Sequence, residues 1–120
     1  MYESGEDYLE SILMIHNEKG SVHSVDVAKK LGVSKPSVSR AMGILKDGGY
    51  LDFEGTELHL TSKGMEKAND IYSRHRLLTD FLAKITGVPE EQAEENACRV
   101  EHDIDADVVA GITKWMEKNQ

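Results

Sequence analysis

Two short amphipathic segments separated by a tight break, directly ahead of a change in hydrophobic period, constrain the fold of this chain most strongly. Ser24 is predicted to cap a first short helix, which ends at Gly32. Ser34 is predicted to cap a second helix with Pro36 in its first turn, where the missing backbone N–H costs little. Apolar residues recur at helical spacing and are expected to face inward, namely Val25, Ala28 and Leu31 in the first segment and Val38, Ala41, Met42 and Leu45 in the second.

The second helix is expected to end at Gly48-Gly49, after which apolar and polar residues alternate. The apolar members of this alternation are Leu51, Phe53, Leu58 and Leu60. Gly55-Thr56 lies between the two alternating halves, so this segment is predicted to form a β-hairpin. A short helix, a sharp corner, a capped helix and a hairpin, in this order, make a winged helix-turn-helix.

Four further helices are predicted, over approximately residues 4–18, 61–86, 89–102 and 105–118, so the fold class is mainly α. The 120 residues suffice for one small domain or two very small ones that share a core. No apolar run approaches the roughly 20 residues of a membrane helix, and the acidic N-terminus is unlike a secretory signal. A single cysteine makes no internal disulfide, so we expect a cytoplasmic protein with no membrane partner.

The net charge of −8, averaged over the chain, argues against a nucleic-acid partner. Its distribution argues otherwise. Between His23 and Gly49, five basic residues accompany two acidic ones, which gives a local charge of +3 and leaves −11 for the rest. Eight acidic residues and one arginine lie between Glu90 and Asp107. The basic segment coincides with the predicted helix-turn-helix.

The outward positions of the second helix in this element are therefore candidates for contacts with double-stranded DNA. Arginine pairs bidentately with guanine, serine hydroxyls bind phosphates or bases, and a helix N-terminus accepts a phosphate. The candidate DNA-binding residues are Ser34, Lys35, Pro36, Ser37, Ser39, Arg40 and Lys46. Glu54 and Glu57 at the hairpin tip should repel phosphates, so we expect the helix to be the principal contact. Capped, serine-rich helices with a few lysines also occur in proteins that bind no nucleic acid.

The only cysteine, Cys98, is followed by Glu101 and His102 at helical spacings i+3 and i+4. A thiol, a carboxylate and an imidazole would thus project from one helix face, and all three are metal-ligating groups. Taken singly, the cysteine is as well explained as a small buried apolar residue, and the Glu-His pair as solvated surface.

Three further residues are weaker candidates for the same site. Asp7 and Glu10 share a face of the predicted first helix, although acids at this spacing are usually exposed surface. His75 lies near the apolar side of the long helix, where a lone histidine is more often a satisfied core residue. A compact fold would have to pack the three helices that carry these six residues.

Several motifs in order resemble the diphtheria toxin repressor family of iron- or manganese-dependent transcriptional regulators. They are Tyr8-Leu9 with its flanking acids, the segment from Val27-Ala28 to Leu45, Leu60-Thr61-Ser62-Lys63-Gly64, Arg74-His75-Arg76-Leu77-Leu78, and Ala97-Cys98-Arg99-Val100-Glu101-His102. The resemblance implies a homodimer, with a winged helix-turn-helix DNA-binding domain over residues 1–62 and a helical metal-binding and dimerisation domain over residues 63–120. No counterpart of the SH3-like domain of longer members is expected after the last predicted helix.

Matched by position, the resemblance implies a ligand set of Asp7, Glu10, His75, Cys98, Glu101 and His102. The acidic pair at positions 7 and 10 is similar to the manganese transport regulators, which have glutamate where Cys98 stands. Cys98 instead resembles the iron-dependent repressors, which lack the acidic pair. The expected cofactor is therefore Mn(II) or Fe(II), with one or two ions per subunit.

We expect a metal-dependent repressor that binds a palindromic operator as a homodimer. One alternative is a winged-helix regulator controlled by an organic ligand or a protein partner, with the acids as mere surface. Another is an enzyme that uses Cys98 and His102 as nucleophile and base, but no orienting third residue or oxyanion donor is apparent nearby. We therefore do not expect an enzyme.

Overall fold

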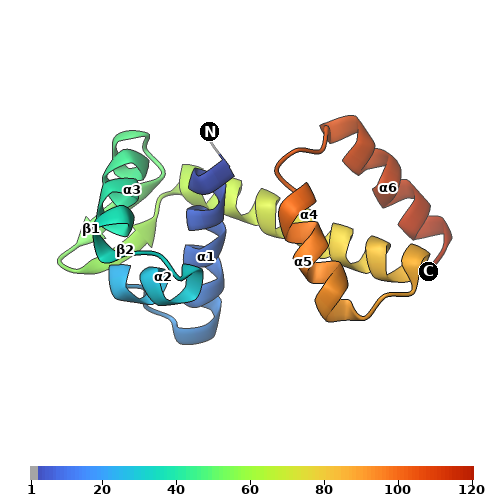
Figure 1. Cartoon of the computed structure of the whole chain (residues 1–120). Helices are drawn as coiled ribbons and strands as arrows, with labels where there is room; N and C mark the ends of the chain where they lie inside the picture. Colours follow the sequence, from blue (N-terminus) through green and yellow to red (C-terminus); the bar gives the residue numbers. More distant parts are fainter. Residues whose placement is uncertain (1–2) are drawn as a thin grey trace. The chain divides into compact units, whose positions relative to one another are not determined.

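The computed structural model describes residues 3–120, which form six helices and one two-stranded antiparallel sheet (Figure 1). In chain order the elements are α1 (Glu3–Lys19), α2 (Ser24–Leu31), α3 (Lys35–Asp47), β1 (Leu51–Glu54), β2 (Glu57–Leu60), α4 (Ser62–Thr86), α5 (Glu90–Val100) and α6 (Ala106–Lys118). This order confirms the predicted mainly α winged helix-turn-helix. The chain forms two compact units, one ending at Asn69 and one spanning Asp70–Gln120, and the boundary lies within α4.

The first unit has an apolar core to which each of its elements contributes. Its buried residues are Leu9, Ile12, Leu13, Ile15, Val22, Val27, Ala28, Val38, Met42, Leu45, Leu51, Leu58 and Ala68. The stripe on α3 is the predicted one, because three of its four expected inward residues are buried. The sharp corner between α2 and α3 is made at Gly32, whose φ of 66° favours glycine.

The cap of α3 is confirmed, whereas that of α2 is not. Ser34 Oγ accepts a hydrogen bond from the backbone N–H of Ser37 at 3.3 Å. The residue that caps α2 is His23 rather than Ser24, and its N–H donates to Asp26 Oδ2 at 2.9 Å. The inward stripe shifts accordingly, so that Val25 is 47% exposed and Val27 is fully buried.

The hairpin has the predicted turn, and a third segment joins it. Leu51 pairs with Leu60, and Phe53 pairs with Leu58. The N–H of Leu58 donates to Val22 O at 2.8 Å, and His23 forms a bridge with Glu57. This pairing fixes the start of α2 and explains why its N-cap is His23, one residue before the predicted Ser24.

The second unit has a small core in which polar residues take a large share. Its buried residues are Ile71, His75, Leu78, Thr79, Ala93, Ala97 and Glu101. Among the described residues, α6 contributes none to this core. Trp115 of α6 instead packs edge-on against Phe81 of α4, with 5.6 Å between the ring centroids.

The last turn of α5 differs from the prediction. The helix ends at Val100 rather than at residue 102, because the chain turns where the N–H of Asp103 donates to Val100 O at 3.0 Å. Within residues 3–120, no helix is both long and apolar enough to cross a membrane.

Candidate metal centre and nucleic-acid interface

Glu101 is the most deeply buried charged residue of the second unit, with 1% of its surface exposed. It directly follows α5, and its N–H still donates to Ala97 O at 2.9 Å, so it continues the helical path by one residue. Its side chain therefore stays on the face of α5 that turns inward. A carboxylate is costly to bury unless it is paired, hydrogen-bonded or bound to a metal.

His75, from the middle of α4, contacts this carboxylate directly. Its Nδ1 lies 2.7 Å from Glu101 Oε2, and its Nε2 lies 3.4 Å from Glu94 Oε1. The imidazole thus lies between the carboxylate of Glu94 on α5 and that of Glu101 directly after α5. Sequence reasoning missed Glu94, although it precedes Glu101 by two helical turns, a spacing that places both residues on one face.

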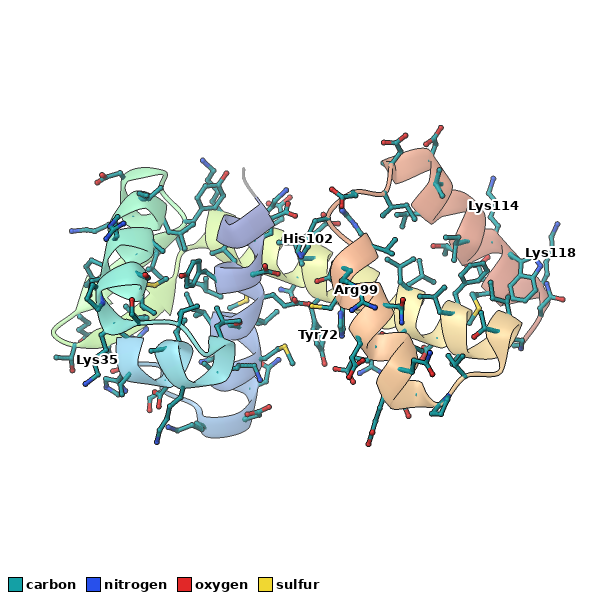
Figure 2. All side chains as sticks on the ribbon, viewed as in Figure 1. Lys35, Tyr72, Arg99, His102, Lys114 and Lys118 are labelled. Atoms are coloured by element: carbon teal, nitrogen blue, oxygen red, sulfur yellow. The ribbon has the colours of Figure 1, made fainter. Side chains whose placement is uncertain are left out.

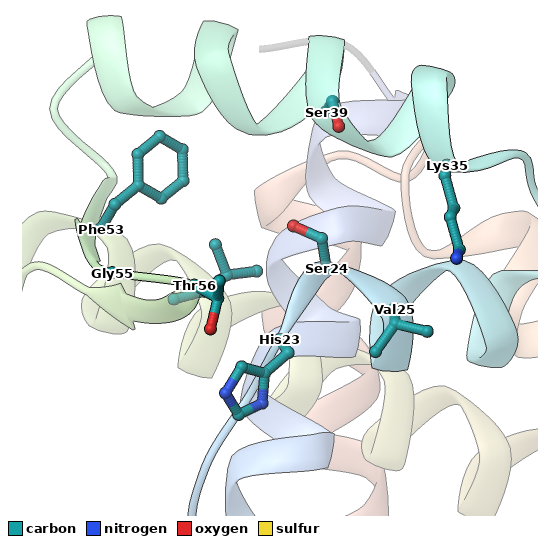
Figure 3. A pocket seen from close by; sticks show the side chains of 9 residues that line it. His23, Ser24, Val25, Lys35, Ser39, Phe53, Gly55 and Thr56 are labelled. Atoms are coloured by element: carbon teal, nitrogen blue, oxygen red, sulfur yellow. The ribbon is translucent and has the colours of Figure 1, made fainter.

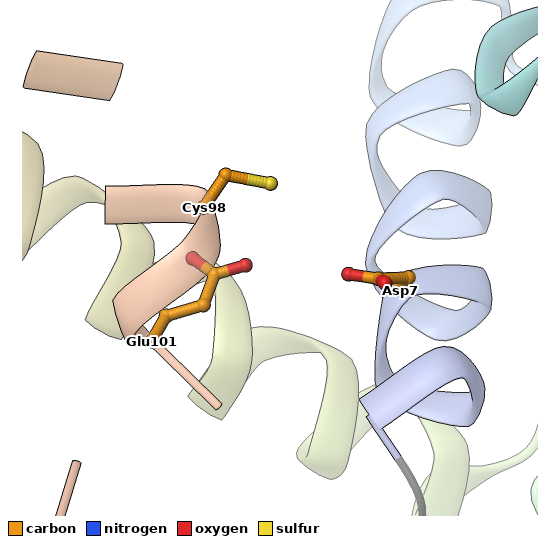
Figure 4. Close-up of side chains that lie close together, drawn as sticks. All are labelled: Asp7, Cys98 and Glu101. Atoms are coloured by element: carbon orange, nitrogen blue, oxygen red, sulfur yellow. The ribbon is translucent and has the colours of Figure 1, made fainter. Parts of the chain in front are cut away.

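His102 and Cys98 complete the group within the second unit. His102 Nε2 lies 3.3 Å from Glu101 Oε1, and only 2% of the His102 side chain is exposed. His102 is located in the turn after α5 rather than on the helix, so the predicted single helix face is wrong for this residue (Figure 2). Cys98 is exposed, and its Sγ lies within 4.8 Å of a Glu101 carboxylate oxygen (Figure 4).

The donor set of this group fits a divalent transition metal. It offers a carboxylate, two imidazoles and a thiol, which are the side chains that bind such ions. Glu101 Oε1 is buried and accepts no hydrogen bond within the described residues, although His102 Nε2 lies 3.3 Å away. A ligand bond to a cation would satisfy this oxygen.

The two remaining candidates lie on α1, in the first unit. Asp7 is partly exposed and projects from the first half of the helix (Figure 4). Glu10, one turn later, is 5% exposed although it carries a carboxylate. The burial of Glu10 is inconsistent with the expectation that this residue is ordinary exposed surface.

Six of the seven candidate DNA-binding residues lie at the N-cap or in the first half of α3, and the seventh, Lys46, lies in its last turn. Lys35, Ser39 and Arg40 are exposed there, and Lys35 and Ser39 border a pocket between α2, α3 and the hairpin (Figure 3). Pro36 is also exposed, in the first turn. Ser37 is half-buried, and its hydroxyl accepts a hydrogen bond from Ser34 Oγ at 2.8 Å.

Two contacts modify the expectation for the hairpin. Lys46 Nζ lies 5.4 Å from the centroid of the Phe53 ring, which brings a cation from α3 against the wing. His59 Nε2 lies 3.2 Å from Glu54 Oε2 and 3.8 Å from Glu57 Oε2. A histidine therefore accompanies the two acids that are expected to repel phosphates.

Family models match almost the entire chain. The model described as "Iron dependent repressor, N-terminal DNA binding domain" matches residues 1–57. The model described as "Iron dependent repressor, metal binding and dimerisation domain" matches residues 61–120.

Individual relatives agree with these models. The chain is 32% identical to an uncharacterised HTH-type transcriptional regulator of Methanocaldococcus jannaschii over 98% of this chain and 96% of the relative. It is 34% identical to the HTH-type transcriptional regulator MntR of Bacillus subtilis (strain 168), over 97% of this chain and 84% of the relative.

Solved structures give the same assignment. The structure of IdeR from T. acidophilum matches with a TM-score of 0.85 and 26% identity, over 93% of this chain and 53% of that one. A manganese-dependent transcriptional repressor in complex with manganese matches with a TM-score of 0.88 and 26% identity, over 94% of this chain and 52% of that one. The chain thus spans about half the length of these two proteins. It belongs to the iron-dependent repressor family, that of the diphtheria toxin repressor, whose members regulate transcription and are not enzymes.

Proposed function

We propose that this protein is a repressor that binds a palindromic DNA operator as a homodimer when it holds Mn(II) or Fe(II). The observation that carries the proposal is Glu101, a buried carboxylate with an imidazole nitrogen 2.7 Å from one oxygen and another 3.3 Å from the second. A structural role would be served at lower cost by an apolar side chain, whereas a metal site needs these donors.

We assign the ligand set to six residues, with one or two ions per subunit: Asp7, Glu10, His75, Cys98, Glu101 and His102. The oxygen ligands suit Mn(II), whereas the Cys98 thiolate favours softer ions such as Fe(II). A bound dication supplies positive charge that offsets the mutual repulsion of the acids. Glu94 is a further candidate because of its contact with His75.

The ligands come from both units, and this division suggests how metal binding acts on DNA binding. Asp7 and Glu10 belong to the unit that ends at Asn69, and the other four belong to the unit that begins at Asp70. Ligation through Asp7 and Glu10 would couple the metal to α1, which packs against α2 and α3, and so to the spacing of the two α3 helices in a dimer. Bound metal would then raise the affinity for DNA, and bound DNA would raise the affinity for metal by the same factor.

In this proposal residues 1–62 bind DNA and contribute Asp7 and Glu10 to the metal site, whereas residues 63–120 supply the other four ligands and dimerise. We assign the DNA contacts to Ser34, Lys35, Pro36, Ser37, Ser39, Arg40 and Lys46. The N-terminus of α3 would accept a phosphate, and the exposed Arg40 would reach a base or a phosphate. Half-sites about one helical turn apart would match the two-fold symmetry of the dimer.

The decisive experiment measures DNA binding against metal. A duplex would first be selected from a random library with the full chain in Mn(II). Its affinity would then be measured by fluorescence anisotropy in Mn(II), Fe(II), Zn(II) or EDTA under reducing, anaerobic conditions. We expect EDTA to abolish specific DNA binding. We expect Glu101→Ala to keep its fold but to lose the DNA binding that metal activates in the wild type. Binding that is equal with Mn(II) and with EDTA would contradict the proposal and favour control by an organic ligand or a protein partner.

A further inference from the structure

Two consecutive residues of α4 hold the same residue of the second unit. Arg74 Nη1 donates a hydrogen bond to the backbone carbonyl of Glu101 at 2.8 Å. His75 Nδ1 lies 2.7 Å from the carboxylate of Glu101. One turn of α4 therefore fixes both the backbone and the side chain of Glu101.

The carbonyl that Arg74 binds has no helical partner of its own. It follows the last residue of α5, and the carbonyls at a helix C-terminus need partners from outside the helix. A guanidinium satisfies such a carbonyl and complements the negative end of the helix dipole. Arg74 Nη2 also lies 3.2 Å from Asp70 Oδ2, one turn earlier on α4, which holds the planar fork in place.

This carbonyl belongs to the peptide unit that joins Glu101 to His102. Because the peptide unit is planar, a hydrogen bond to its oxygen fixes the orientation of the whole plane. The Cα atoms of Glu101 and His102 lie at the two ends of that plane. Arg74 thereby constrains the relative position of two side chains whose polar atoms are 3.3 Å apart.

We propose that Arg74 is a positioning residue for the metal site: it binds no metal, and it sets the geometry that Glu101 and His102 offer to the ion. The inference rests on the proposed function, because it assumes that these two residues are ligands. Only 20% of the Arg74 side chain is exposed, so its stem also packs, and the test must separate position from packing.

The test compares Arg74→Met, Arg74→Lys and Arg99→Met in the full chain. Methionine keeps much of the apolar stem, and lysine keeps the charge with a single ammonium group in place of the fork. Arg99 is exposed in the last turn of α5, so Arg99→Met removes the same charge near the same helix end without removing a bond to Glu101 (Figure 2).

The affinity for Mn(II) would be measured by calorimetry on metal-free protein, and the site geometry by the absorption spectrum of bound Co(II). We expect Arg74→Met to weaken Mn(II) binding about 10- to 100-fold and to change the Co(II) spectrum, as for other residues that orient metal ligands. Arg74→Lys should recover part of the loss, and Arg99→Met should resemble the wild type. A purely structural role would lower the urea midpoint of the metal-free protein and leave the Co(II) spectrum of the folded fraction unchanged.

Wild-type Mn(II) affinity and an unchanged Co(II) spectrum in Arg74→Met would overturn this inference alone. If Arg74→Met does not fold, the same two measurements on Arg74→Lys decide, and wild-type values there also overturn it. Failure of the wild-type protein to bind Mn(II) or Co(II) stoichiometrically would instead contradict the proposed function itself.

Discussion

Gly64, in the first turn of α4, lies directly against the backbone carbonyl of Tyr50, so that a Cβ atom at position 64 would be 1.9 Å from that oxygen. The contact belongs to a larger junction. Thr61 N–H donates to the same Tyr50 carbonyl at 3.1 Å, and Thr61 Oγ1 donates to Gly49 O at 2.6 Å. The start of α4 is thus hydrogen-bonded to the segment between α3 and the hairpin. Only glycine fits at position 64 in this contact.

We predict that Gly64→Ala destabilises the protein by about 1–3 kcal/mol or more, because the added methyl group must displace backbone rather than a flexible side chain. Gly43→Ala is the matched control. Position 43 is inside α3, and a Cβ there would meet no heavy atom of the described residues within 4 Å. That change should stabilise the protein by about 0.4–1 kcal/mol. Urea denaturation measures both, and equal effects would contradict the assignment of the Gly64 contact.

Asp26 makes the stability of the first unit depend on pH. The hydrogen bond from the Lys19 side chain, Nζ to Oδ1 at 2.8 Å, and that from the His23 backbone N–H lower the pKa of Asp26 below its ordinary value of 3.8. The ionised carboxylate therefore stabilises the folded state at neutral pH, and this contribution is lost as the pH falls through the folded-state pKa.

We predict that Asp26→Asn lowers the free energy of unfolding by a constant amount between about pH 5 and 7, and that the difference from wild type shrinks below about pH 4. The measurement is urea denaturation over this pH range. Asp52→Asn, at an exposed position of β1, serves as the control for the removal of one carboxylate. A difference for Asp26→Asn that grows toward acid would be incompatible with the lowered pKa.

Arg40→Ala should weaken binding to the selected duplex by about 1–3 kcal/mol if the guanidinium pairs bidentately with a base. Lys114→Ala removes the same charge from an exposed position of α6 and should change the affinity little at fixed salt (Figure 2). Anisotropy titrations of both variants at two salt concentrations separate a base contact from a general charge effect. Equal losses in the two variants would remove Arg40 from the specific interface.

The apolar groove between α4 and α6 should be covered in the proposed homodimer. Its lining residues are Phe81, Ile85, Val108, Gly111, Ile112 and Trp115. Val108 is 48% exposed there, so Val108→Glu would place a charge in the interface and should shift the protein toward monomer at micromolar concentration. Thr113→Glu, on the same helix outside the groove, is the control. Sedimentation velocity measures the oligomeric state of the wild type and both variants. A monomeric wild type would refute the assignment of the groove to the dimer interface.

The sequence predicted the fold correctly where an element is determined by residues that are close to one another in the chain. Ser34 followed by Pro36 marks the start of α3, and the apolar spacing of α3 predicts its buried face because the helix packs through that face alone. The hairpin turn at Gly55 follows from local chemistry as well. These elements required no knowledge of distant contacts.

The errors arose where distant contacts decide. His23 rather than Ser24 caps α2 because the preceding residue pairs with β2, a contact across more than 30 residues that no local preference encodes. The early end of α5 left His102 outside the helix, and the distant contact at this end is the bond from Arg74 of α4 to the Glu101 carbonyl. Glu94 and Arg74 were missed because their roles follow from the packing of α4 against Glu101 rather than from a motif.

The exposure of the side chains of α6 should make this helix open locally more readily than the other helices. A helix of 13 residues with, within the described range, no buried side chain has few interactions that resist local opening. Its amide hydrogens should therefore exchange with deuterated solvent early in a dilute sample, well before those of α1. If a second subunit covers the groove, their protection should rise with protein concentration, so that the exchange rate of this single helix reports the association constant of the dimer.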